Sequence, residues 1–388
     1  MDRTLAELVR ISNEVGADKW LVLGGFGNTS VKTRDGKYMY IKASGTGLKD
    51  MTSTKGWRRL RVEAVLAILK DRTIASTDGN KRQSQVSSAL LSAADDEFDR
   101  GVKPSIESCF HAMFGRYVIH LHPVAVLGYA CARDGKKAID RLFKNRNLSP
   151  VWVPYANPGY MLAKRIEKVA AGYERQYGRL PAVLFLQNHG VVVTADNANT
   201  TLQLVHRVIR LCESKLNQPK PVRTKPADER TISELTSCIG DVIFEATGKR
   251  MQVEYFTDDV TAWFMARKDA GQLCAGEVVT PDELVYARGR PVWIDKWRRK
   301  TLVSKLNRRI AAGRKPPAGF LVKPYGLFVA GPKNALPLLK DVISNCLAIR
   351  AFAARFGGIR PLNKRQRQFI IGLIEKNSTA ETGGSGCV

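Results

Sequence analysis

The chain has 388 residues, of which 44% are hydrophobic and 25% are charged, so it can bury a full core and is not expected to be disordered. No apolar stretch is long enough to span a bilayer, and the N-terminus lacks the apolar core of a signal peptide. Seven cysteines without Cys-x-x-Cys spacing argue against a disulfide framework and against a cysteine-based metal site. We therefore expect a cytoplasmic protein with two domains, or with one large domain and an appendage.

Basic residues greatly exceed acidic ones: 62 Lys plus Arg against 36 Asp plus Glu give a formal net charge of +26. Such an excess attracts polyanions such as nucleic acid, and it also steers small anions such as phosphorylated sugars. The basic residues are spread along the chain, and no zinc-finger or aromatic RNA-binding pattern accompanies them. A basic proteome or an unusual intracellular milieu would also explain this charge, so the charge alone decides nothing. Nucleic-acid binding stays as an alternative to a small-molecule substrate.

The first half of the chain is predicted to mix helices and strands. An amphipathic helix is expected over residues 1–17, and a strand over 28–34 is joined to a return strand over 37–43 by the hairpin signal Asp35-Gly36. The later expected elements are helices near 57–71 and 83–99, a helix starting within 104–111 with Ser105 as its N-cap, a strand over 117–122, a helix near 123–133, a loop over 153–159, a helix over 160–177, a hairpin over 182–194 and a helix over 197–216.

Composition predicts where the domains divide. Residues 217–226 contain three prolines among basic residues, which is typical of a linker. We expect a first domain over 1–216, a linker over 217–229, a second α/β domain over 230–377 and a disordered tail over 378–388.

Two segments of the chain resemble each other. Residues 181–193 align without a gap with residues 317–329, and each copy is followed by a helical pattern. The likeness reflects either a duplication or convergence on a hairpin followed by a helix. In the second copy Tyr325 stands at the position of His189, so a duplicated second domain would be a partial repeat without a metal site.

Three of the five histidines form the most informative pattern. His120 and His122 lie on one predicted strand, where side chains at i and i+2 point to the same face, about 7 Å apart. His189 sits in Asn188-His189-Gly190 at a tight turn. Two imidazoles on one face and a third from another segment form a tripod for a divalent metal with an open coordination position, as in catalytic zinc sites. The alternative is that these histidines are ordinary core or surface residues.

Glu107 is the candidate catalytic carboxylate. A helix N-terminus and a nearby cation would both keep it ionised. An ionised carboxylate beside a metal-bound carbonyl compound is suited to remove a proton from the adjacent carbon, while the metal stabilises the enediolate. The alternative is an exposed acid that the helix dipole favours.

Two glycine-containing loops, 27–30 and 44–47, are candidate anion sites. They offer backbone N–H groups, hydroxyls and an amide, with Lys32 and Lys42 on the joining strands, and glycine lets the backbone approach a phosphate closely. The loops do not match a dinucleotide fingerprint, because Ser30 and a strand follow where a glycine and a helix are required. Such sequences also commonly form plain turns.

Together these motifs resemble the class II aldolase/adducin family, and most of all the aldolase portion of rhamnulose-1-phosphate aldolase/alcohol dehydrogenase fusion proteins. The likeness continues through Thr280-Pro-Asp-Glu283 and the Tyr325-Gly326 hairpin, whereas the dehydrogenase half of those fusions has no counterpart in this sequence. The motifs that carry it lie in the family's order within roughly residues 1–215: Gly27-Asn-Thr-Ser30, Ala43-Ser-Gly45, Pro104-Ser-Ile-Glu107, His120-Leu-His122, Pro154-Tyr-Ala-Asn-Pro-Gly159 and Asn188-His-Gly190.

The resemblance implies a three-layer α/β/α fold around a central, mostly antiparallel sheet, plus a smaller C-terminal α/β region. It implies Zn²⁺ or another divalent metal on the three histidines, with Glu107 as catalytic acid/base. The implied reaction cleaves a (phospho)ketose to dihydroxyacetone phosphate and an aldehyde through a metal-stabilised enediolate, in a homo-oligomer that is commonly a tetramer. The implied substrate or phosphate contacts are Asn28, Thr29, Ser44, Gly45 and Ser105.

Two departures from the family pattern affect these expectations. Fuculose-phosphate aldolases carry a Ser-Ser-Glu phosphate contact, and Ile106 replaces its second serine here. Those enzymes also use a downstream tyrosine as proton donor, and no counterpart occurs between Arg133 and Pro150. The general acid is unassigned, with Tyr155 and Tyr160 available. The same scaffold also hosts epimerases, dehydratases, decarboxylases and adducin-like binding modules, and adducin-type members tend to lose the metal histidines that this chain keeps.

Overall fold

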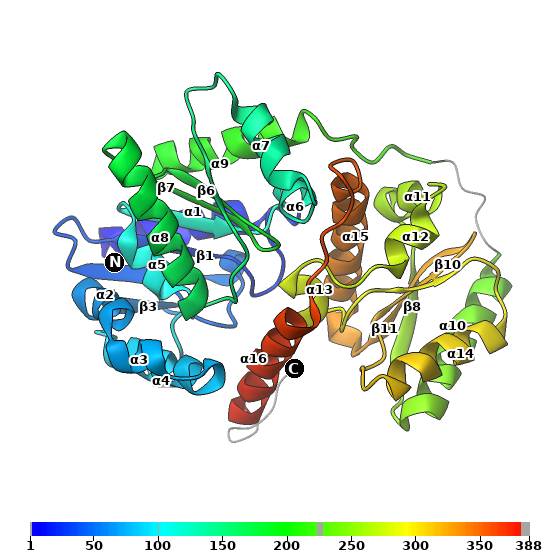
Figure 1. Ribbon diagram of the computed structural model, residues 1–388. Helices are drawn as coiled ribbons and strands as arrows, with labels where there is room; N and C mark the ends of the chain where they lie inside the picture. Colours follow the sequence, from blue (N-terminus) through cyan, green and yellow to red (C-terminus); the bar gives the residue numbers. More distant parts are fainter. Residues whose placement is uncertain (1, 100, 223–227, 382–388) are drawn as a thin grey trace. The chain divides into compact units, whose positions relative to one another are not determined.

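The computed structural model describes residues 2–99, 101–222 and 228–381 (Figure 1). The chain divides into two compact units: Met1–Ala130 with Lys136–Lys215, and Cys131–Gly135 with Leu216–Val388. Within the described residues, no helix combines the length and the apolar character needed to cross a membrane.

The first unit is built on a seven-stranded sheet in the order β3-β2-β1-β4-β7-β6-β5. Neighbouring strands are antiparallel except β5 and β6, which are parallel. The strands are β1 (Asn28–Lys32), β2 (Tyr38–Lys42), β3 (Trp57–Arg61), β4 (Tyr117–Leu121), β5 (Val151–Val153), β6 (Val183–Leu186) and β7 (Gly190–Ala195).

Helices cover both faces of this sheet, which confirms the expected three-layer α/β/α arrangement (Figure 1). Helices α1, α6 and α9 pack on one face, and α2, α5 and α8 pack on the other. The helices of the unit are α1 (Arg3–Gly16), α2 (Val62–Lys70), α3 (Arg72–Ser76), α4 (Gly79–Ser92), α5 (Ser108–Met113), α6 (Val124–Ala130), α7 (Gly135–Phe143), α8 (Tyr160–Tyr177), α9 (Ala198–Glu213) and the 3₁₀ turn η1 (Leu48–Asp50).

The sheet face under α2, α5 and α8 carries the apolar core next to the site. Val118 and Leu184 of the sheet pack in one cluster with Phe110 of α5 and Ile166 of α8, all fully buried. Burying side chains of this size contributes about 1.5–3 kcal/mol each. This packing fixes α5, and the turn before it, against the centre of the sheet.

The helix predicted near residues 57–71 is wrong for its first five residues, which form the edge strand β3 paired with β2. Arg58 and Leu60 both point inward, the alternation of a strand. This alternation is hard to see in the sequence, because the charged residue Arg58 occupies an inward position. Its guanidinium can be buried because Asp96 neutralises it at 2.9 Å. The helix itself begins at Val62.

The second unit holds a four-stranded sheet in the order β8-β11-β10-β9. Its strands are β8 (Gln252–Phe256), β9 (Val292–Ile294), β10 (Gly319–Val322) and β11 (Gly326–Gly331). Its helices are α10 (Glu229–Thr247), α11 (Asp259–Met265), α12 (Ala270–Ala275), α13 (Pro281–Val285), α14 (Arg299–Ala311), α15 (Leu336–Ala353), α16 (Lys364–Glu381) and the 3₁₀ turn η2 (Lys333–Ala335).

The units differ in three ways from the division expected from composition. Cys131–Gly135 joins the second unit, where Arg133 N–H donates to Gly358 O at 2.9 Å, a long-range pairing that a proline-rich linker signal does not reveal. Helix α10 begins at the end of the expected linker, whose residues 223–227 lie outside the described ones. Helix α16 runs to Glu381, into the expected disordered tail, and 382–388 are not described.

Four strands of the first sheet have the same order and directions as the whole second sheet. Strands β10 and β11 match β6 and β7 residue for residue in the gap-free alignment, and the parallel neighbours β5 and β9 pair in the same register. The antiparallel neighbours β4 and β8 also match, which places Tyr255 at the position of His120. This agreement in order, direction and register favours a duplication over convergence.

Candidate metal centre

The structure brings the three predicted metal histidines together. His120 lies on β4, His122 follows that strand, and His189 precedes β7. One ligand atom from each lies within 4.8 Å of the others, and this is the one such group of histidine, cysteine or acidic side chains among the described residues. All three rings are at least 95% buried, because their exposed fractions are 0%, 5% and 5%.

Local backbone geometry explains why the turn can deliver His189 to β4. Asn188 adopts a left-handed conformation with φ 57°, which asparagine tolerates better than most residues. Gly190 lies so close to β4 that an added Cβ would stand 2.2 Å from the Leu121 carbonyl oxygen and 2.9 Å from the ring of His122. Glycine is therefore required at this position for the two segments to meet.

The nitrogen atoms that face one another have the character of metal ligands. Nδ1 of His120 donates to the Val191 carbonyl oxygen at 3.0 Å, which leaves its Nε2 as the lone-pair atom directed at the cluster. The Nε2 atoms of His120 and His122 are 3.2 Å apart. Burial lowers the pKa of His189 to about 3, against the opposing effect of Glu107, so the ring is neutral at neutral pH. Neutral imidazole is the form that binds a cation.

Glu107 lies inside the cluster, so the interpretation of an exposed helix-start acid is wrong. Its side chain is 5% exposed, and its Oε1 and Oε2 lie 3.4 Å from Nε2 of His189 and of His120 respectively. Burial raises the pKa of Glu107, but His120, His189 and the Asn28 amide outweigh it and lower that pKa to about 2. The group is therefore a carboxylate at neutral pH.

The surroundings of one oxygen of this carboxylate suit a bound cation. Oε1 of Glu107 is buried and has no hydrogen-bond partner, and it faces the ring nitrogen of a neutral His189. Two lone-pair atoms facing each other in a buried place repel unless a proton or a cation lies close to both. The three imidazole nitrogens form a donor set that suits a divalent metal with an open coordination position, as is typical of catalytic zinc, and the unpartnered carboxylate oxygen beside them adds the negative charge that favours a cation.

A buried chain of hydrogen bonds holds Glu107 from behind. Asn28 donates from Nδ2 to Oε2 of Glu107 at 2.8 Å, while its Oδ1 accepts from Nε2 of His111. Nδ1 of His111 must then accept, and the Ser30 hydroxyl donates to it at 2.8 Å. The connection of His111 to Glu107 through Asn28 was not predicted from the sequence. Asn28 and Ser30 share one face of β1, which was a signal in the sequence.

The remaining predicted contacts are divided between this cluster and other places. Ser105 is buried next to Glu107, and its hydroxyl accepts from the Glu107 N–H at 3.3 Å. Because α5 begins at Ser108, Glu107 occupies the N-cap position that was expected for Ser105. Ser44 and Gly45 lie exposed in the loop after β2.

Thr29 is not brought to the cluster. It is fully buried on the opposite face of β1, and its hydroxyl is 2.6 Å from that of Ser12 on α1. The two candidate tyrosines also make other contacts: Tyr155 donates to Asn157 at 3.3 Å, and Tyr160 belongs to the apolar core with its hydroxyl buried and unpartnered. Burial raises the pKa of both phenols.

Lys42 joins the turn before β1 to the loop after β2 instead of offering its charge to a ligand. Its ammonium group donates to the carbonyl oxygens of Gly25 and Thr46, both at 2.7 Å. Burial lowers the pKa of Lys42 to about 8, and Glu107 opposes this shift. Lys32 likewise donates to backbone carbonyls, those of Phe114 and Gly115. Both lysines therefore position loops.

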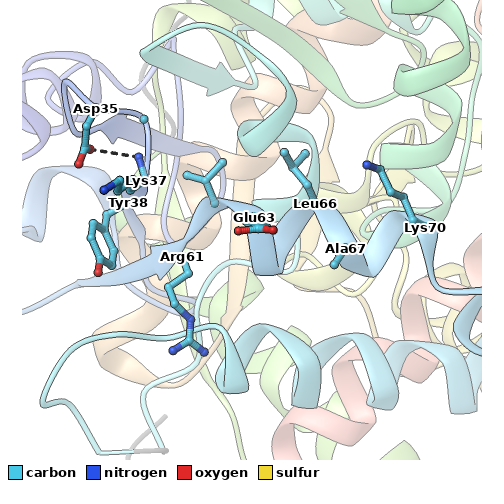
Figure 2. A pocket seen from close by; sticks show the side chains of 10 residues that line it. Asp35, Lys37, Tyr38, Arg61, Glu63, Leu66, Ala67 and Lys70 are labelled. Atoms are coloured by element: carbon cyan, nitrogen blue, oxygen red, sulfur yellow. Dashed lines mark hydrogen bonds between the residues drawn. The ribbon is translucent and has the colours of Figure 1, made fainter.

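A separate pocket of about 610 Å³ lies beside the β1–β2 hairpin and helix α2. Figure 2 shows its charged lining, where Asp35 is hydrogen-bonded to Lys37 and where Glu63 and Lys70 project from α2. None of the predicted site residues lines it, so it is distinct from the histidine cluster.

Comparisons with solved structures return proteins of the aldolase type. The N-terminal class II aldolase domain of a conserved protein from Thermoplasma acidophilum is 24% identical, with 55% of this chain and 94% of that one covered and a TM-score of 0.45. L-fuculose-1-phosphate aldolase from Thermus thermophilus is 17% identical, with 55% and 92% covered and a TM-score of 0.32.

A curated relative from Bacillus subtilis (strain 168) carries the name uncharacterized oxidoreductase YuxG. It is 27% identical over 331 residues, which cover 81% of this chain and 45% of the relative, so the chain spans less than half of that protein's length. The family model of the class II aldolase and adducin N-terminal domain matches residues 6–216. This match covers more than half of the sequence, and the chain therefore belongs to the class II aldolase and adducin family.

Proposed function

We propose that this protein is a divalent-metal-dependent aldolase, an aldehyde-lyase that cleaves a (phospho)ketose to dihydroxyacetone phosphate and an aldehyde. The observation that carries the proposal is the convergence of three buried imidazoles on an ionised carboxylate whose Oε1 has no hydrogen-bond partner. An adducin-like binding module would not need a buried carboxylate kept ionised at such a cost in desolvation.

His120, His122 and His189 would hold the metal ion, with Zn²⁺ as the first candidate. When bound, the ion supplies Lewis-acid stabilisation of negative charge on the substrate oxygens. Glu107 moves the proton: in condensation the carboxylate removes a proton from the carbon next to the carbonyl group, and in cleavage it returns to that carbon the proton that the substrate's hydroxyl group gives up as the carbon–carbon bond breaks. The Asn28–His111–Ser30 chain keeps the carboxylate in one orientation for this transfer.

The exposed Ser44 and Gly45 are the proposed contacts of the substrate's phosphate or hydroxyl groups, together with Asn28 and Ser105. Gly45 adopts φ 81°, and an added Cβ there would meet nothing within 4 Å, so the loop leaves open space for a ligand. Successive backbone N–H groups in such a loop form an anion-binding concavity. Ile106 removes one hydroxyl from the fuculose-type contact, which favours a substrate that is held by fewer side-chain donors.

The test combines metal analysis with a cleavage assay. Wild-type protein should contain about one zinc per chain by elemental analysis, as one tripod requires, and should release an aldehyde from at least one ketose 1-phosphate in a panel. His189→Ala should lose both metal and cleavage, whereas Glu107→Gln should keep the metal and lose cleavage. His206→Ala, an exposed histidine outside the cluster, is the matched control and should change neither.

Each failure has a distinct meaning. Cleavage that survives complete metal removal contradicts the metal mechanism. A bound metal with one product of unchanged carbon count, or with release of water or CO₂, would assign the centre to an epimerase, a dehydratase or a decarboxylase. A wild-type protein that neither contains nor takes up zinc would demote the histidines to structural residues, and the adducin-like module would then be the better interpretation.

A further inference from the structure

The second unit contains a cationic pocket that the proposed aldolase chemistry does not use. It lies where α12, β9 and α14 come together and has a volume of about 370 Å³. Its basic lining residues are Arg290, Lys305, Arg308, Arg309 and Arg314, and Glu277 is the one acidic residue among those that line it. The charge of this pocket is therefore strongly unbalanced.

Glu277 cannot neutralise the group because it is already engaged. Arg314 forms two hydrogen bonds with its carboxylate, at 2.9 and 3.1 Å, and Arg367 lies 3.7 Å from it. Among the described residues, no carboxylate lies within ion-pairing distance of the other four basic side chains that line the pocket. An anion that entered would meet cations whose charge is uncompensated.

Two of the arginines are fixed in place by backbone carbonyls. Arg290 donates to the carbonyl oxygens of Cys274 and Ala275 at 2.9 and 2.6 Å, and Arg309 donates to that of Lys315 at 2.7 Å. Burial, followed by repulsion from Arg314 and Arg290, lowers the pKa of Arg309 to about 10. Glu277 and Glu283 oppose this lowering only in part, and no carboxylate among the described residues lies within ion-pairing distance of Arg290 or Arg309. The two guanidinium groups are thus held in place by backbone carbonyls, which is the preorganisation that anion binding requires.

Apolar surface adjoins the basic residues. Trp293 on β9 lines the pocket and is partly exposed, with its indole edge beside Gly271, where an added Cβ would lie 3.0 Å from Nε1. A second pocket of about 440 Å³ shares Arg290 and Arg309 with the first and is lined by Leu284, Leu339 and other apolar side chains. A ligand that fits both has a charged end and an apolar or aromatic part.

We propose that this pocket of the second unit binds an organic phosphate, with its phosphate groups among Arg290, Lys305 and Arg308 and its organic part against Trp293. The cations converge in a concave site next to an indole and apolar surface, a combination that suits a small ligand with two parts. A polynucleotide is better served by an extended cationic surface. The inference is independent of the metal centre.

The test measures binding of pyrophosphate and of ADP to the full-length chain by isothermal titration calorimetry at fixed salt. Lys305→Gln/Arg308→Gln removes two exposed cations that line the pocket, and it should weaken both probes by at least about tenfold. Arg298→Gln/Lys300→Gln removes the same charge from exposed positions near the start of α14 that do not line the pocket. This matched control should bind both probes as the wild type does.

A second variant separates the two parts of the ligand. Trp293→Ala should weaken ADP binding several-fold and leave pyrophosphate binding unchanged, which also shows that the variant is folded. Absence of binding at millimolar probe, or equal weakening by both double variants, would overturn the proposal. So would an oligonucleotide that binds with a steep salt dependence while ADP and pyrophosphate do not, since that result indicates a nucleic-acid surface.

Discussion

Asn28 and Glu107 are 79 positions apart in the chain, yet the amide of Asn28 donates to Oε2 of Glu107 at 2.8 Å. The same Asn28 is the register partner of His120 across β1 and β4. One residue of the first strand thus holds the candidate catalytic carboxylate while it sits directly beside a candidate metal ligand. This arrangement makes the orientation of Glu107 depend on the pairing of two central strands.

Replacing Asn28 should therefore affect turnover more than metal binding. Asn28→Ala removes the donor to Glu107 and the acceptor for His111, so the carboxylate loses its fixed orientation. We expect cleavage to fall by about a hundredfold, the usual cost of a misplacement of about 1 Å, with metal content unchanged. Thr29→Val, on the opposite face of the same strand, is the control and should keep most activity. A metal-free Asn28→Ala protein would show that the residue supports the metal site instead.

Activity should survive in part when His111 is replaced by a residue that can still donate a hydrogen bond to Asn28. His111→Gln can still present an N–H to Asn28 Oδ1, whereas His111→Phe leaves that oxygen buried and unpaired, which costs about 1–3 kcal/mol. We expect partial rescue of kcat by glutamine relative to phenylalanine, at equal metal content. Equal loss in both variants would mean that His111 matters only as a packed ring against Phe110.

The cluster of three histidines was more predictable from the sequence than the residues that hold Glu107 from behind. Period-two spacing alone places His120 and His122 on one face, and the Asn-His-Gly sequence marks the turn that carries His189. In β1 the same period-two alternation places Thr29 on the opposite face of the strand from Asn28 and Ser30. The sequence itself therefore indicated that Thr29 does not belong with the predicted substrate contacts. The Asn28–His111 contact links residues 83 positions apart, and no local pattern encodes that pairing.

Helices and strands could be predicted from the sequence where the pattern of polar and apolar residues matches the secondary structure that they form. Helix α8 occupies Tyr160–Tyr177 as expected, between a glycine at its start and Gly178 in a left-handed C-cap. The strand β3 was missed because Arg58 points inward to a buried aspartate, which looks polar in the sequence and behaves as core in the fold. Helix α7 (Gly135–Phe143) was also missed, although Asp134, a favoured N-cap residue, stands directly before it in the sequence.

The stability of the first unit should rise with pH in a window set by Lys32. Burial lowers its pKa to about 8, against an opposing effect of Asp196, while an unfolded lysine titrates near 10.4. Between about pH 8 and 10.4 the unfolded state therefore binds more protons, so the free energy of unfolding increases with pH, by at most about 1.4 kcal/mol per pH unit for one proton.

Lys32→Met should flatten this rise, as measured by urea unfolding at several pH values. Buried Lys42, whose pKa is also about 8, should account for part of the slope that remains. Lys70→Met, at an exposed position of α2, controls for the loss of one charge. A Lys32→Met protein whose slope matches that of the wild type would contradict the assignment.

The stability of the second unit should depend strongly on the ion pair between Glu283 and Arg350. Both side chains are almost fully buried, and Nη2 of Arg350 donates to Oε1 of Glu283 at 2.7 Å. Burial lowers the pKa of Arg350, but Glu283 outweighs that effect and raises it, so the charge is kept. Glu283 also accepts from the Val279 N–H at 2.8 Å and thereby fixes the start of α13.

Glu283→Gln should lower the free energy of unfolding by about 3–5 kcal/mol, because it leaves a buried guanidinium without a counter-charge. The double variant Glu283→Leu/Arg350→Met should recover a large part of this loss, since it removes both charges together. Arg230→Ala breaks the exposed pair with Glu234 in the same unit and should cost less than about 1 kcal/mol. Urea denaturation of the full chain measures all three variants. A double variant as unstable as Glu283→Gln would show that the backbone contacts of Glu283 and Arg350, and not their charges, hold this part of the fold.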